Sequence, residues 1–100
     1  MGMKNFSAAV RHMAASPKTI QERVGDAYLY HLCHLKTEEL PEEIQTDFED
    51  LKSRLTSEQP IGDEGSVNAT IRNMNEFEAL KIAQKIVYMT EIIESRLRDQ

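Results

Sequence analysis

The 100-residue chain contains one cysteine, no tryptophan, four glycines and three prolines, and it has no long run of apolar residues. The lone cysteine, Cys33, cannot form an internal disulfide bond. A membrane-spanning helix needs about 20 consecutive apolar residues, and the first residues lack the apolar stretch of a secretory signal peptide. We therefore expect one cytoplasmic domain covering residues 1–100, without membrane attachment.

Basic side chains are scarce as well. The chain carries 12 lysines and arginines against 17 aspartates and glutamates, which gives a net charge of −5. Nucleic-acid-binding proteins usually present a basic stripe to the phosphates, so we expect no direct binding of DNA or RNA. The glycine-rich loops of nucleotide-binding proteins and the G-x-S-x-G motif of hydrolases are also missing. The sequence favours a protein without catalytic residues and without a cofactor.

Apolar residues recur three and four positions apart over most of the chain, which is typical of amphipathic helices. Ser16–Pro17, Pro41 and Asn75 suit the first turns of helices, and Glu78 completes a capping-box pattern with Asn75. Residues 56–66, rich in turn formers and charge, are predicted to form a polar loop. The sequence therefore predicts an all-α fold, a compact bundle of four to five helices at about residues 5–15, 17–36, 41–55, 67–74 and 76–98.

Two histidines and the only cysteine lie within four residues, as His31, Cys33 and His34. Histidines three positions apart on a helix can share a metal ion, so His31 and His34 are the candidate metal ligands. No glutamate stands three residues before either histidine, as the ferritin-like di-iron pattern requires. We interpret His31 as a core residue and His34 as a surface residue. A metal- or ligand-binding site centred on the two is the alternative.

An acidic four-helix domain of this size also resembles the histidine phosphotransfer domains. In that family a lysine follows the phosphate-accepting histidine by three residues and a small residue comes after it. Here Lys36 follows His34 by only two residues, and no glycine comes after it. For His31, the residue three positions later is His34 and not a lysine. The resemblance lies in size and class, and phosphate acceptance by these histidines is a further alternative.

Five apolar side chains are predicted to point away from the core: Leu29, Leu32, Cys33, Tyr88 and Ile92. The first three fall on a different side of their helix from His31, and the last two lie opposite the core-facing seam of the last helix. Monomers of this size usually leave less apolar surface exposed. We therefore expect a homodimer that forms through these side chains.

Residues 37–51 hold seven acidic residues and no basic one. Four of them are predicted to form an acidic face: Glu39, Glu43, Asp47 and Asp50. Acidic side chains near a helix start interact favourably with the helix dipole, so a solvated face is the ordinary interpretation. The alternative is a docking surface for a basic protein partner, or a decoy that imitates nucleic-acid phosphates.

In size, charge and helix content the chain resembles the many short helical proteins that bacteria encode, a likeness of type that assigns no residue a role. The sequence best fits a small helical protein–protein interaction or regulatory module that self-associates and has no catalysis of its own.

Overall fold

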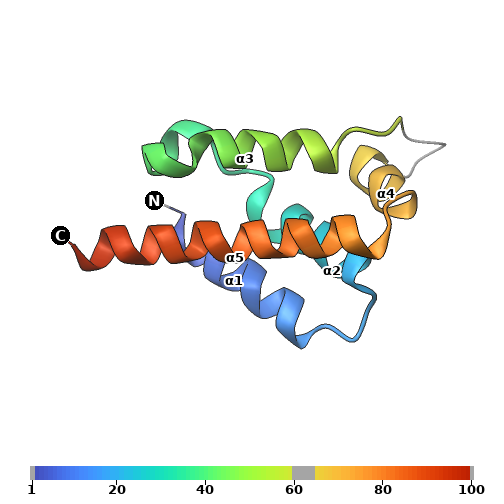
Figure 1. Ribbon diagram of the computed structural model, residues 1–100, viewed down its shortest axis with the longest axis horizontal. Coiled ribbons are helices and arrows are strands. Elements are labelled where there is room, and N and C mark those ends of the chain that lie inside the picture. Colours follow the sequence, from blue (N-terminus) through green and yellow to red (C-terminus); the bar gives the residue numbers. More distant parts are fainter. Residues whose placement is uncertain (1, 60–64, 100) are drawn as a thin grey trace.

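The computed structural model describes residues 2–59 and 65–99 (Figure 1). Residues 60–64 of the predicted 56–66 loop lie outside the described part of the chain. The described residues form helices and no strand, which confirms the all-α bundle. The α-helices are α1 (Met3–Ala15), α2 (Ile20–Ala27), α3 (Glu42–Leu55), α4 (Gly65–Arg72) and α5 (Glu76–Arg98), with a π-helical turn, η1 (Tyr28–Leu32), and a 3₁₀ turn, η2 (Thr37–Glu39).

The predicted helix at 17–36 is wrong at both ends, whereas the other helices begin and end within two residues of the prediction. Its start is set by Thr19, whose hydroxyl accepts a hydrogen bond from the backbone N–H of Glu22 at 3.2 Å. The Glu22 carboxylate accepts the Thr19 N–H in return, at 3.4 Å. This capping box fixes Thr19 in an extended conformation, so Ser16 and Pro17 lie before the helix.

The C-terminal part of the same helix widens into the π-helical turn η1. The backbone N–H of Cys33 donates to the carbonyl of Tyr28, five residues earlier, at 2.8 Å. A π turn holds more residues than an α turn. The side chains after Tyr28 are therefore rotated back about the helix axis from the positions they would have in a regular α-helix. Tyr28 and Leu32 consequently face the core, and His31 lies at its edge. The prediction of His31 as a core residue is corrected accordingly.

Helix α5 is the centre of the bundle and packs against α1, α2 and α3. In Figure 1 it runs along the length of the molecule, and α3 lies beside it in the opposite direction. Its predicted core-facing seam is confirmed, because these side chains are buried: Ala79, Ile82, Ile86, Met89 and Ile93. The rings of Phe6 on α1 and Phe48 on α3 contact each other with centres 6.2 Å apart, and both side chains are completely buried.

Helix α4 closes one end of the bundle against α2 (Figure 1). A methyl group added at Gly25 would lie 2.9 Å from Cδ1 of Ile71 and 3.7 Å from Cγ1 of Val67. The absence of a side chain at Gly25 therefore makes room for the apolar side of α4.

The described helices include none with the length and apolar character needed to cross a membrane. The longest, α5, has 23 residues, and its buried apolar positions alternate with exposed charged ones.

Candidate functional site

The structure pairs His31 with His12 rather than with His34. Nε2 of His31 on η1 lies 3.4 Å from Nδ1 of His12 on α1, and the two rings meet edge to face at 5.4 Å. His34 follows the end of the helix and is exposed. Among the described residues it forms no hydrogen bond or ion pair with His31. The two histidines predicted as a pair are thus not brought together, and the surface position predicted for His34 is observed.

Besides His31, two side chains lie against the His12 ring, Asp26 and Tyr30. The Asp26 carboxylate lies 3.9 Å from its Nε2, within ion-pair distance, and Asp26 is itself bound by Lys18 at 2.9 Å. The Tyr30 ring stacks on the imidazole with centres 5.7 Å apart. The His12 side chain nevertheless keeps 28% of its surface exposed, so solvent reaches the pair.

His31 is positioned through its backbone as well. The Asn5 side-chain amide donates to the carbonyl oxygen of His31 at 2.9 Å, which ties α1 to the π-helical turn. Burial lowers the pKa of the His31 imidazole, and the charges of His12 and Arg11 lower it further. A lower pKa favours the neutral form of the ring, in which one nitrogen carries a lone pair.

His12 was not among the residues singled out by the sequence. Its position in α1 lies beside the apolar stripe, where a polar side chain is unremarkable. Two helices joined by a short connection usually lie side by side and antiparallel. Residues 16–19 are such a connection, so the last turns of α1 are expected to lie close to the first turns of α2. This expectation brings His12 near Asp26. The π turn that follows α2 then places His31 beside the same ring.

In the part of the chain that the structure describes, no base that could activate a nucleophile contacts the Cys33 thiol. Its thiol donates to the carbonyl of Leu29 at 3.2 Å, and its side chain packs partly against the core. No group of three or more histidine, cysteine, aspartate or glutamate side chains placed to hold a metal ion occurs in residues 2–59 and 65–99. Any metal bound here would have two protein nitrogens as its main ligands.

The predicted apolar surface is only partly correct. Leu29 and Tyr88 are exposed, at 36% and 45%. The prediction for Leu32 is wrong, because the π turn rotates this side chain into the core, where it is completely buried. Cys33 and Ile92 are also corrected, since both are partly buried against the core.

A larger apolar surface lies on the solvent-facing side of α5. Four exposed side chains form this surface, which we call the outer face: Phe77, Leu80, Val87 and Tyr88. The sequence signal for it is the three-four-three spacing of positions 77, 80, 84 and 87, a second seam on the side opposite the buried one. Phe77 is the most exposed of the four, at 77%.

The predicted acidic face is largely occupied by ion pairs. Asp47 binds Lys85 of α5 at 3.0 Å, and Glu43 binds Arg96 of α5 at 3.3 Å. Asp50 binds Arg54 one turn further along α3, at 3.0 Å.

Glu39, the fourth acidic residue, accepts the backbone N–H of Lys36 at 3.2 Å. Together these contacts compensate much of the negative charge that a basic partner would recognise.

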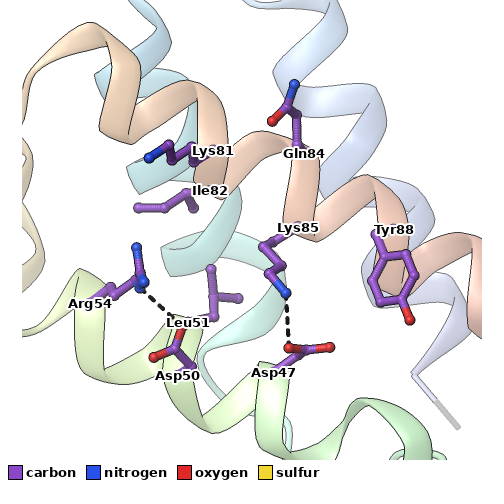
Figure 2. Close-up of a pocket in the computed structure, with 9 residues that line it drawn as sticks. All are labelled: Asp47, Asp50, Leu51, Arg54, Lys81, Ile82, Gln84, Lys85 and Tyr88. Carbon is purple, nitrogen blue, oxygen red and sulfur yellow. Dashed lines mark hydrogen bonds and ion pairs between the residues drawn. The ribbon is translucent and has the colours of Figure 1, made fainter.

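Between α3 and α5 lies an open groove of about 440 Å³. Figure 2 shows the Asp47–Lys85 and Asp50–Arg54 pairs along it, with Leu51 and Ile82 at its base and Tyr88 at one end. Lys85 also lies 5.8 Å from the centre of the Tyr88 ring. The groove thus joins the acidic face of α3 to the outer face of α5.

Comparison with protein-family models finds no match, and neither the curated proteins nor the solved structures include a similar chain.

Proposed function

We propose that the protein is a helical interaction module that forms a homodimer through the outer face of α5, without catalysis of its own. The observation that carries this proposal is the gathering of Phe77, Leu80, Val87 and Tyr88 on one side of a single helix. Contiguous exposed apolar surface of this kind marks association sites in proteins that do not span membranes. When a helix is apolar on two sides and the bundle covers one of them, the second side needs a partner to cover it.

The polar residue within the outer face favours a second copy as the partner. Gln84 lies between Leu80 and Val87 in the seam. A glutamine side chain both donates and accepts hydrogen bonds, so it can pair with the same residue of another copy across a two-fold axis. Polar residues at such positions fix the register of paired helices. With Gln84 on the axis, two α5 helices run antiparallel and Leu80 packs against Tyr88 of the other copy.

The charges along α5 agree with this orientation. Lys81 lies in the N-terminal half and Glu91 in the C-terminal half, and neither forms an ion pair within the described chain. In the antiparallel arrangement Lys81 lies four residues along the axis from Glu91 of the other copy, about 6 Å at 1.5 Å per residue, and the symmetry makes this approach twice. A parallel arrangement would place like charges together instead.

Sedimentation of the untagged protein tests the proposal, with the variants Leu80→Lys and Val87→Lys. We expect the wild-type chain to sediment as a dimer at tens of micromolar and both variants as monomers, because each buries a charge in the apolar seam. The matched control is Leu97→Lys, since Leu97 lies on the same helix with 41% exposure but outside the outer face. It should leave the dimer intact.

A wild-type chain that is monomeric at this concentration would overturn the proposal. A dimer that Leu97→Lys dissociates and the two outer-face variants leave intact would place the interface elsewhere. Circular dichroism of each variant separates loss of association from loss of folding.

A further inference from the structure

The distance between the facing ring nitrogens of His12 and His31 matches the distance between two ligands of one metal ion. Nδ1 of His12 and Nε2 of His31 are 3.4 Å apart. Zinc binds imidazole nitrogen at about 2.0–2.1 Å with tetrahedral angles, which places two such nitrogens about 3.3–3.4 Å from each other. The two nitrogens are therefore already at the spacing that one shared ion requires.

The surroundings of His12 follow the pattern that supports metal-binding histidines. A histidine ligand usually donates its second ring N–H to a carboxylate, which fixes the tautomer and the ring orientation. Here the Asp26 carboxylate lies 3.9 Å from Nε2, on the side of the ring away from His31, which is beyond hydrogen-bond distance but near enough to favour a proton on that nitrogen. Lys18 in turn holds Asp26, and Tyr30 restrains the ring from its face. With the proton on Nε2, facing Asp26, Nδ1 has the lone pair that a metal ion needs.

The π-helical turn is what places His31 opposite this nitrogen. A regular α-helix would direct His31 toward the core, whereas the wider turn moves it to the edge beside α1. Such single turns often occur at functional sites. The partial exposure of His12 leaves room for water molecules at the remaining coordination positions.

From these three observations we propose that His12 and His31 form a binding site for a transition-metal dication of the Zn²⁺ class. Imidazole nitrogen suits Zn²⁺, Ni²⁺ and Cu²⁺, and excludes Mg²⁺ and Ca²⁺, which take oxygen ligands. On binding, His31 carries its proton on Nδ1 and presents the Nε2 lone pair to the ion. The site lies between α1 and η1 and does not depend on the proposed dimer.

Calorimetric titration of the chelator-treated protein with Zn²⁺ tests the site. The chain has three histidines, so His12→Gln and His31→Gln have a matched control in His34→Gln. We expect one Zn²⁺ per chain for the wild type, the same affinity for His34→Gln, and at least a tenfold loss for each of the other two variants. Cys33→Ser, which removes the only thiol, should leave the affinity unchanged.

Proton NMR of the wild-type imidazoles gives a second readout that needs no variant. Addition of Zn²⁺ should shift the ring signals of His12 and His31 and leave those of His34 in place. Absence of Zn²⁺ binding by the wild type, or unchanged affinity in His12→Gln, would overturn the proposal. Loss of affinity in His34→Gln with His12→Gln unaffected would assign the ion to His31 and His34 instead.

Discussion

Nζ of Lys85 lies 3.0 Å from Oδ1 of Asp47, so the middle of α5 is joined to α3 by an ion pair at the rim of the groove (Figure 2). Both side chains are partly exposed, at 51% and 28%. Exposed pairs of this kind contribute about 0.2–1 kcal/mol to stability, and salt screens them.

The first prediction concerns this pair. Asp47→Lys should lower the free energy of unfolding, because it places a second ammonium group beside Lys85. The exchange Asp47→Lys with Lys85→Asp should recover part of the loss. Urea denaturation of the wild type, Asp47→Ala, Lys85→Ala and the double alanine variant gives the coupling energy, because these variants remove the pair without adding a repulsion. We expect about 0.2–1 kcal/mol in low salt and less in high salt. A coupling of zero in low salt would mean that the contact does not hold α3 to α5.

Charge reversal on the acidic face tests whether that face is needed for dimer formation. Glu43 and Asp47 pair with Arg96 and Lys85 of α5, whereas Asp50 pairs with Arg54 within α3. Reversal of all three to lysine should weaken the α3–α5 contact through the first two, without preventing dimer formation. Salt-sensitive capture of a basic protein that disappears in this triple variant, with an unchanged fold, would instead support the docking alternative.

The second prediction concerns the start of α2. Thr19→Ala should destabilise the protein by about 1 kcal/mol, because it removes the hydroxyl that accepts the Glu22 N–H. Ser16→Ala is the control, since its hydroxyl accepts a single longer hydrogen bond, from the Lys18 N–H at 3.3 Å, outside the helix. Thermal or urea denaturation measures both. A larger loss for Ser16→Ala than for Thr19→Ala would place the helix start at Ser16.

The starts of α5 and α2 show how far the sequence predicts the fold. Asn75 and Glu78 form the single capping box near the start of the last helix, and the predicted range 76–98 agrees with α5. At the second helix, Ser16–Pro17 and Thr19 with Glu22 are competing start signals three residues apart. The reciprocal hydrogen bonds of the capping box decide in favour of Thr19.

The candidate site is harder to predict than the helices. Its nitrogens belong to residues 19 positions apart, His12 and His31, and they meet only because α1 and α2 pack together. The π turn has no periodicity signal of its own, because a helical wheel assumes 3.6 residues per turn throughout. The same error that placed His31 in the core placed Leu32 outside it.

The third prediction tests that rotation directly. Leu32→Ala should lower the free energy of unfolding by about 2–5 kcal/mol, because it leaves a cavity in the core. Leu29→Ala, one turn earlier and exposed, should change it by about 0.5 kcal/mol. Urea denaturation compares the two variants under identical conditions. A loss for Leu32→Ala as small as that for Leu29→Ala would mean that Leu32 points away from the core, as the regular α-helix predicts.

The fourth prediction uses Tyr28, the buried aromatic residue at the start of the π turn. Burial raises the pKa of its phenol, and the charges of Cys33 and Glu49 add to the effect. In the unfolded chain the phenol ionises near its ordinary pKa of 10.0. Above that pH the unfolded state therefore binds fewer protons than the folded state, so the free energy of unfolding falls as pH rises toward the higher pKa of the folded protein.

Tyr28→Phe removes this contribution, since phenylalanine fills the same space and does not ionise. The variant should have a flatter pH dependence of unfolding between about pH 9 and pH 11 than the wild type, measured by urea denaturation. The absence of tryptophan allows phenolate formation to be followed by absorbance, and the variant should lose the tyrosine that ionises at higher pH. Equal slopes for the two proteins would mean that Tyr28 ionises alike in the folded and unfolded chain and does not lie in the core.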